Sequence, residues 1–151
     1  MSDYLSIKQQ LIEHCQGFVQ RKRDTITKSI ASHKNDLYTE TKSSAGDKHE
    51  TGRAMIQLEM EKSGQQLVVV SEMEMVLERI QIERVSNIVK LGSLVETSKG
   101  TYFLAISIGQ VAIEENLFLV VSPQSPIGKQ LLGKKANEII PFNSAVIVKV
   151  L

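Results

Sequence analysis

Apolar residues in the first part of the chain recur at helical spacing. From about residue 4 to residue 37 they fall three, four, seven or eight positions apart, which places them on one stripe of a helix. The stripe consists of Tyr4, Ile7, Leu11, Cys15, Phe18, Ile26, Ile30 and Leu37. No proline interrupts it, and Gly17 alone costs about 1 kcal/mol relative to alanine. The pattern predicts one long helix.

A second stripe predicts a second helix from about residue 47 to residue 82. Its apolar members are Met55, Leu58, Val69, Met73, Val76 and Ile80. Two narrow stripes, one on each helix, are typical of an antiparallel two-stranded coiled coil, whereas a four-helix bundle needs wider apolar faces. The alternative is that the helix pair packs along a third element.

The pattern changes after residue 85, where strands replace helices. Val95 with its neighbours and residues 101–106 read as two strands joined by a turn at 98–100, and the continuous apolar run 117–121 reads as a buried strand. We expect residues 109–116 to form a loop or a short helical turn. Residues 138–142 and 145–151 read as the last two strands, the first of them at an edge because of Pro141.

The segment 125–133 carries the start and stop signals of one short helix. Ser125 suits the N-cap, Pro126 the first helical position and Gly133 the C-terminal stop. The predicted fold is therefore α+β. An N-terminal helical hairpin covers residues 1–84 with its tip at about 43–54, and a small, mostly antiparallel sheet with one short helix covers residues 85–151.

Composition narrows the class of protein without identifying it. A formal net charge of +1 indicates no global preference for nucleic acid or for membranes. The single cysteine, Cys15, excludes an internal disulfide framework and suits a reducing cytoplasm, and its place on the first stripe predicts a packed core thiol. No apolar run approaches the roughly 20 residues of a membrane span. We expect a cytoplasmic protein without membrane contact.

The hairpin tip holds the best candidates for function. Asp47 and Glu50 lie three residues apart at the start of the second helix, so the two carboxylates can face the same side. Asp at the N-cap with Glu at N3 also resembles a capping box, which stabilises a helix by about 1 kcal/mol. The two roles are compatible. His49 between them is expected to be an exposed tip residue, because no cysteine lies near enough to complete a zinc site.

The second half of the first helix is basic. Such a run is most often a solvated helix face, but clustered cations also bind phosphates through counterion release. The candidates for contact with RNA are Arg21, Lys22, Arg23 and Lys28, with Lys34 beyond them. Because no aromatic residues are interleaved with these cations, the pattern does not predict base recognition.

Three motifs resemble the Gre family (GreA and GreB) of bacterial transcript cleavage factors, and the resemblance covers nearly the whole chain. The run from Ser125 to Lys134, SPIGKQLLGK, is similar to the family's S-P-L-G-x-x-L-[LI]-G-K. Gly92-Ser93-Leu94-Val95 resembles the G-S-x-V that opens the C-terminal domain. Gly46-Asp47-x-x-Glu50 is similar to the G-D-x-x-E-N-A-E-Y of the coiled-coil tip.

The resemblance implies a coiled-coil hairpin followed by an FKBP-like domain. That domain, through Ser125 and Pro126, would dock on RNA polymerase at the rim of its secondary channel. The coiled coil would enter the channel and bring Asp47 and Glu50 to the nascent RNA 3′ end. There they would help hold the catalytic Mg²⁺ that the polymerase shares, an ion not expected on the isolated protein. The chain would stimulate cleavage of backtracked RNA without being an enzyme itself.

The chain departs from the family pattern at the tip. Thr51, Gly52, Arg53 and Ala54 stand where the family has Asn, Ala, Glu and an aromatic residue. A cation thus replaces an acid, which keeps a second hypothesis open: a regulator that binds the channel without promoting cleavage. A third is a peptidyl-prolyl isomerase or chaperone built on the FKBP-like domain, which needs an aromatic-lined pocket. Asn137 stands where the family often has glycine, and asparagine tolerates a positive φ.

Overall fold

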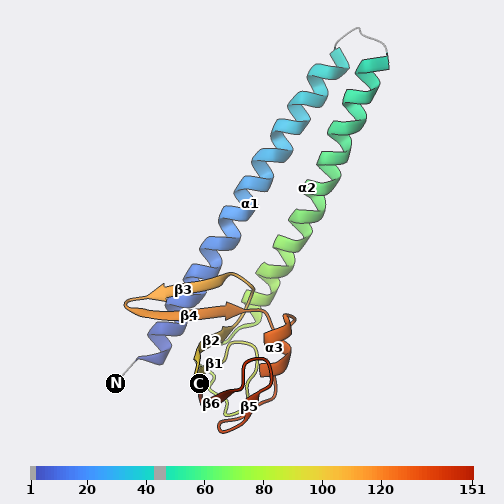
Figure 1. The fold of residues 1–151 in the computed structure, drawn as a ribbon. Helices are drawn as coiled ribbons and strands as arrows, with labels where there is room; N and C mark the ends of the chain where they lie inside the picture. Colours follow the sequence, from blue (N-terminus) through green and yellow to red (C-terminus); the bar gives the residue numbers. More distant parts are fainter. Residues whose placement is uncertain (1–2, 43–46) are drawn as a thin grey trace. The chain divides into compact units, whose positions relative to one another are not determined.

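The computed structural model describes the backbone of residues 3–42 and 47–151, and the side chains of those residues outside 40–50. Helix α1 spans Tyr4–Lys42 and helix α2 spans Asp47–Arg79 (Figure 1). Strands and a short helix follow, which confirms the predicted α+β class. The chain divides into two compact units: Val19–Glu74 forms one, and residues up to Phe18 form the other together with Met75–Leu151. Within residues 3–42 and 47–151, no helix is both long enough and apolar enough to span a membrane.

The unit Val19–Glu74 is a pair of antiparallel helices lying side by side (Figure 1). Its buried and half-buried positions advance in steps of three and four residues along each helix, which is the spacing of one continuous packing seam. On α1 the seam consists of Val19, Arg23, Ile26, Ile30, His33 and Leu37. On α2 it consists of Ile56, Met60, Ser63, Leu67, Val70 and Glu74. Polar residues therefore occupy seam positions on both helices.

The stripe expected on the second helix is wrong for its first three members, whereas the later members Met73, Val76 and Ile80 are half-buried. Met55, Leu58 and Val69 are 65%, 53% and 51% exposed, whereas Val70 is only 2% exposed. A shift of one residue turns a helix by about 100°, so it exchanges the packed face for a neighbouring one. The stripe expected on the first helix is confirmed at Leu11, Cys15 and Ile26, all of which are buried.

The second unit contains a six-stranded sheet in the order β3-β4-β2-β1-β6-β5. The strands are β1 Leu94–Thr97, β2 Gly100–Leu104, β3 Gly109–Ile113, β4 Asn116–Val121, β5 Ile139–Ile140 and β6 Ala145–Val150. Parallel pairing joins β2 to β4, and the other neighbouring strands pair antiparallel. The expectation of a mostly antiparallel sheet is confirmed.

Two expectations for the middle of this unit are wrong. Residues 109–116 are not a loop, because Gly109–Ile113 forms β3, which pairs with β4. Val111 and Ile113 point inward from β3 and are buried. The apolar run 117–121 is not buried throughout, since Leu117 is 61% exposed beside buried Phe118. Both strands alternate inward and outward, as expected of an edge hairpin with one face in water.

The sheet core is completed by the first turns of α1. Leu11 and Cys15 are fully buried within the same unit as the sheet. The Cys15 thiol interacts with the backbone of Ile106, which follows β2, and burial raises its pKa to about 11. A thiol with so high a pKa stays protonated, so Cys15 is a packed core residue, as predicted.

Turns with unusual backbone geometry set the ends of the last strands. Asn137 adopts a φ of 75°, and its N–H donates to the carbonyl of Ile147 over 2.7 Å. Asparagine tolerates this left-handed conformation better than most residues, which agrees with the sequence expectation for the position. The turn leads the chain into β5 at the sheet edge.

Helix α3, Pro126–Leu131, begins at a tight approach of two backbone segments. A Cβ added to Gly128 would lie 1.9 Å from the carbonyl oxygen of Ser122, far inside van der Waals contact. Gly128 is buried, and its own N–H donates to the Ser125 side chain. Only glycine fits at this position.

We therefore expect Gly128→Ala to destabilise the sheet unit by about 2 kcal/mol or more, because backbone atoms must move to admit the methyl group. Urea unfolding followed by tyrosine fluorescence measures the loss, since Tyr102 is buried in this unit. Exposed Gln124→Ala is the matched control and should change stability by less than about 0.5 kcal/mol. An alanine variant as stable as the control would contradict the close approach.

Candidate functional site

The structure places the backbone of the carboxylate pair at the start of α2. Asp47 is the first residue of that helix and Glu50 lies in its first turn. Residues three apart share one face of a helix. Two carboxylates on one face suit Mg²⁺, which favours oxygen ligands and takes one or two carboxylates from a single component. The side chains of both residues, and of His49, lie outside the described residues, so their metal and capping roles stay predictions.

The first tip residues whose side chains the structure describes are those that differ from the Gre motif. Arg53 and Ala54 are exposed and Gly52 is half-buried. Arg53 follows Glu50 by three residues, so the two belong to the same side of α2. A cation one helical turn away would oppose the metal binding predicted for the carboxylates, since local charge sets the strength of such a site.

The predicted docking residues divide into a structural residue and a surface residue. The Ser125 hydroxyl donates to the Ser122 carbonyl over 2.6 Å and accepts from the Gly128 N–H over 3.1 Å. This hydroxyl is therefore engaged as the N-cap of α3, as the sequence predicted. Pro126 is exposed at the first helical position. Docking through Pro126 stays a prediction, and Ser125 would contribute to it by fixing the shape of the turn.

The other end of α3 is tied to the chain before β1. Gly133 has a φ of 80°, and its N–H donates to the Val89 carbonyl over 2.9 Å. The Val89 N–H in turn donates to the Lys134 carbonyl over 2.9 Å. The predicted stop at Gly133 is correct to within two residues, since α3 ends at Leu131.

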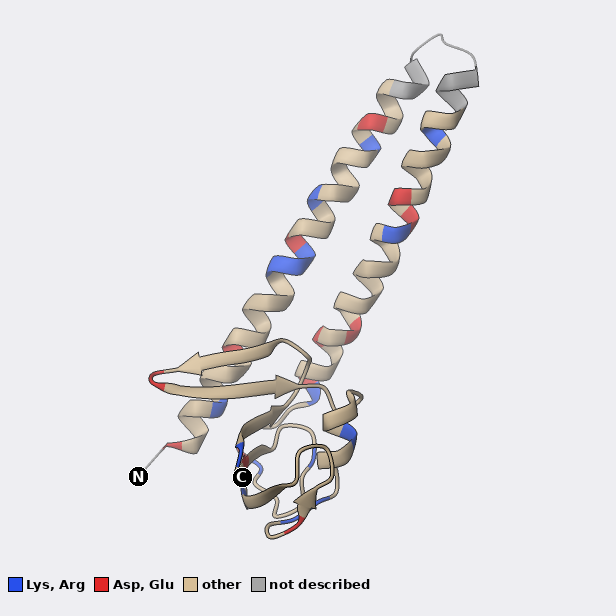
Figure 2. Ribbon diagram, in the orientation of Figure 1, with Lys and Arg blue, Asp and Glu red and all other residues tan. Residues whose placement is uncertain are grey.

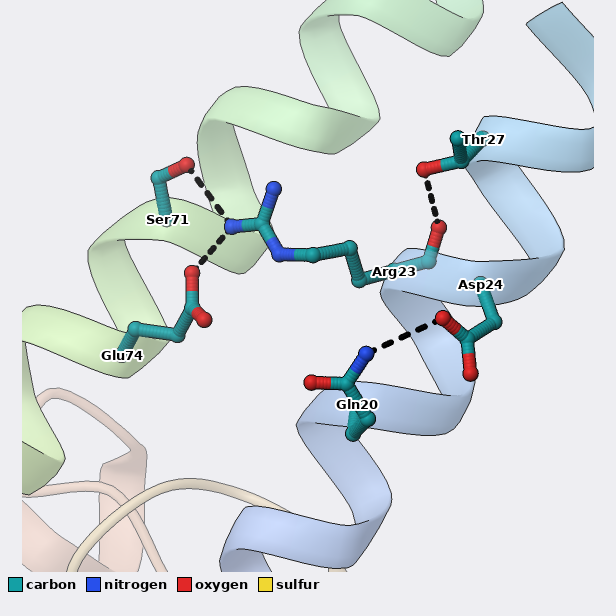
Figure 3. A network of polar contacts seen from close by, with 6 residues as sticks. All are labelled: Gln20, Arg23, Asp24, Thr27, Ser71 and Glu74. Carbon is teal, nitrogen blue, oxygen red and sulfur yellow. Dashed lines mark hydrogen bonds and ion pairs between the residues drawn. The ribbon is translucent and has the colours of Figure 1, made fainter. Parts of the chain in front are cut away.

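The basic residues of α1 do not form one uniform surface. Arg21 and Lys28 are exposed, as is Lys22, and Figure 2 shows acidic residues interleaved with the basic ones along this helix. Arg23 instead turns toward α2, where its guanidinium bonds to the Glu74 carboxylate and to the Ser71 hydroxyl (Figure 3). Arg23 thus serves packing in the helix pair, and contact with RNA stays a prediction for the others.

The polar network around Arg23 was not anticipated from the sequence. The Thr27 hydroxyl donates to the Arg23 carbonyl over 2.7 Å, and the Gln20 amide donates to Asp24 over 3.0 Å (Figure 3). The sequence signal that could have revealed the packed position of Arg23 is its spacing. Arg23 lies four residues after Val19 and three before Ile26, as expected of a residue on the same face of the helix. Charged residues at such positions are easily taken for surface residues.

A second unanticipated residue is Lys8, which is 1% exposed in the sheet unit. It lies three and four positions before buried Leu11 and Ile12, on the apolar side of α1. Its ammonium contacts the Ile82 carbonyl at 3.5 Å. Burial lowers the pKa of Lys8, and the positive charge of Lys90 lowers it further.

The aromatic residues of the sheet unit belong mainly to its core. Tyr102, Phe103 and Phe118 are buried, and Phe142 is 63% exposed. An isomerase site needs several aromatic side chains lining an open pocket, and this arrangement does not favour one.

No protein-family model matches the chain, and no curated protein matches it at a significant level. The chain's own residues and their geometry therefore carry the assignment of function.

The Arg23–Glu74 pair predicts coupled effects on stability. Because removal of one partner leaves the other half-buried without its counter-charge, Arg23→Met and Glu74→Leu should each cost about 1 kcal/mol. The double variant should cost less than the sum, with a coupling of about 0.5–1 kcal/mol. Urea unfolding followed by circular dichroism at 222 nm measures all three. Exposed Arg21→Met combined with Glu74→Leu should show no coupling; strict additivity for Arg23 would mean that the pair adds nothing.

Lys8 predicts a rise of stability with pH. Its pKa in the folded chain lies below the ordinary lysine value of about 10.4, so the unfolded chain binds more protons between the two values. Lys8→Met should therefore stabilise the protein near neutral pH, by about 1–3 kcal/mol, and this gain should shrink as pH rises toward 10.4. Denaturant midpoints at several pH values test this, with exposed Lys135→Met as the control, since Lys135 does not act on Lys8. A gain independent of pH would contradict it.

Proposed function

We propose that this chain is a transcription elongation factor of the Gre type. It would bind RNA polymerase through the secondary channel and stimulate cleavage of backtracked nascent RNA, working in the cytoplasm. The polymerase would supply the substrate, the first metal ion and most of the site, so the chain would be no enzyme by itself. The observation that carries the proposal is the occurrence in one chain, in the family's order, of Gly46-Asp47-x-x-Glu50 and of SPIGKQLLGK.

Features of both units support the finer fold assignment. The three- and four-residue steps of the seam in Val19–Glu74 favour an antiparallel coiled coil. The six-stranded sheet with α3 is consistent with an FKBP-like domain. The resemblance around α3 falls on residues with exacting roles, since Ser125 caps the helix and Gly128 admits no side chain.

Asp47 and Glu50 would act as ligands delivered to the polymerase active site. When bound there, the second Mg²⁺ supplies charge stabilisation for the phosphoryl transfer. The start of α2 would hold the two carboxylates one turn apart on one side of the helix, and so fix the direction from which they approach. Arg21, Lys22 and Lys28 would face nucleic acid only by general attraction to phosphates.

Arg53 favours a second candidate function. Counting Asp47, Lys48, Glu50 and Arg53, the tip has a formal charge of zero with His49 neutral. A neutral tip recruits a cation more weakly than an acidic one. A chain that occupies the channel without promoting cleavage would regulate transcription by that occupancy.

The deciding experiment adds the purified protein to an arrested, end-labelled elongation complex with Mg²⁺. We expect short 3′ fragments that disappear with Asp47→Asn or Glu50→Gln, with losses of about a hundredfold in rate, as for other residues that stabilise transition-state charge. Glu59→Gln, an exposed acid farther along α2, is the matched control and should retain activity. Arg53→Glu should increase cleavage.

Binding without fragments would support the regulator instead. Binding should then persist in Asp47→Asn and weaken in Pro126→Ala. Failure to bind the polymerase at all would contradict both functions.

A further inference from the structure

A pocket of about 210 Å³ lies on one face of the sheet, beside the first turns of α1. We call it the sheet-face pocket. Its apolar lining includes Ile7, Leu94 and Phe118, and its polar lining includes Glu96, Thr101 and Asn116. Leu94 and Phe118 are buried and so form its floor. All of these residues belong to the unit that contains residues 3–18 and 75–151.

The strand register brings the polar lining residues together. Thr101 on β2 is the register partner of Phe118 on β4 and of Glu96 on β1. Register partners lie side by side on the same face of a sheet. Asn116 precedes Phe118 by two residues in β4, so it shares that face as well. Three polar side chains from three neighbouring strands therefore converge on one pocket.

These three side chains are accessible and are not used by the fold. Glu96 and Thr101 are half-buried and Asn116 is exposed, so a ligand can reach each of them from solvent. Among the residues with described side chains, none forms a hydrogen bond to the side chain of Glu96, Thr101 or Asn116. A carboxylate accepts hydrogen bonds, whereas a hydroxyl and an amide both donate and accept. The pocket thus offers several acceptors and donors above an apolar floor.

The charges around the pocket favour a neutral ligand. Lys149 on β6 is the register partner of Glu96, and its ammonium donates to the Tyr4 hydroxyl over 2.9 Å. The pKa of Lys149 lies above its ordinary value, first because of this bond to Tyr4 and also because of the negative charge of Glu96. Since a cation accompanies the carboxylate, their fields partly cancel for a third charge placed nearby. The site therefore attracts neither cations nor anions strongly.

The size of the pocket limits the ligand further. Pockets for drug-sized ligands enclose about 300–1,000 Å³, so this one suits a smaller molecule. It holds about seven water-sized groups, since a water molecule takes up about 30 Å³. A matching ligand carries several hydroxyl groups along its edge and an apolar face of C–H groups.

We propose that the sheet-face pocket binds a single neutral sugar ring. Hydroxyl groups of the ring donate to the Glu96 carboxylate and exchange hydrogen bonds with Thr101 and Asn116, while the C–H face packs on Phe118. The site contains none of the residues assigned to polymerase or metal binding. The proposal therefore stands independently of the transcription function.

The test titrates D-glucose, D-galactose and D-mannose separately into the ¹⁵N-labelled full chain near pH 7. Binding is followed by amide chemical shifts, which should change around residues 4–7, 94–96, 101 and 116–118. We expect a dissociation constant on the order of 1–10 mM for the best of the three sugars, given a ligand of about a dozen heavy atoms. Cyclohexanol, a ring with one hydroxyl group, should bind at least about tenfold more weakly.

Variants assign the binding to the pocket. Glu96→Gln should weaken the best sugar about tenfold, because hydrogen bonds to a charged acceptor are the stronger ones. Asn116→Ala changes an exposed residue, so it tests the site even if Glu96→Gln disturbs folding, and it should weaken binding about threefold or more. Glu115→Gln is the matched control: it is exposed, adjacent to Asn116 and outside the lining, and should change affinity less than about twofold.

Three results would overturn the proposal. Absence of saturable shifts with all three sugars up to about 100 mM would show that the pocket holds only water. Unchanged affinity in both Glu96→Gln and Asn116→Ala would place the sugar elsewhere. D-glucosamine, which carries an ammonium group, is the charged comparison; if it bound more than about tenfold more tightly than D-glucose, the pocket would be a cation site governed by Glu96.

Discussion

The sheet unit depends on contact between the first turns of α1 and the residues that follow Met75. Leu11 and Cys15 of α1 are fully buried in the unit whose remaining residues begin at Met75. The Cys15 thiol reaches the backbone of Ile106, and Lys8 reaches Ile82. The strands after residue 94 therefore do not bury their own apolar surface completely. Since a unit of this size has few apolar residues to spare, the first turns of α1 are part of its core.

The helix pair depends on a different balance. Its seam mixes apolar residues such as Val19 and Val70 with Arg23, His33, Ser63 and Glu74. The Nδ1 atom of His33 is buried without a hydrogen-bond partner. Polar seam residues lower stability relative to apolar ones, but they disfavour sliding of one helix past the other, because a slip separates Arg23 from Glu74. The polar seam residues thus lower stability but fix the register of the two helices. A defined register is needed for any function that depends on the position of the tip.

Sequence patterns predicted those features that local chemistry decides. The caps of α3 follow from Ser125, Pro126 and Gly133, and the α1 stripe follows from spacing alone. The face of α2 was predicted wrongly, because two stripes one residue apart are both partly apolar and only the partner helix selects one. β3 was missed, although Val111 and Ile113 alternate with exposed residues as in a strand. Lys8 could not be recognised as buried without the chain segment that covers it.

The burial of Cys15 against Ile106 also has a consequence for synthesis on the ribosome. About 90 residues separate the two, which at about 5–20 residues per second corresponds to a delay of roughly 5–20 s. Helices form within about a microsecond, so α1 exists long before its strand partners emerge. During that interval its apolar face from Leu11 to Cys15 is uncovered and available to chaperones. The apolar surface of α1 is therefore synthesised before the residues that cover it in the folded protein.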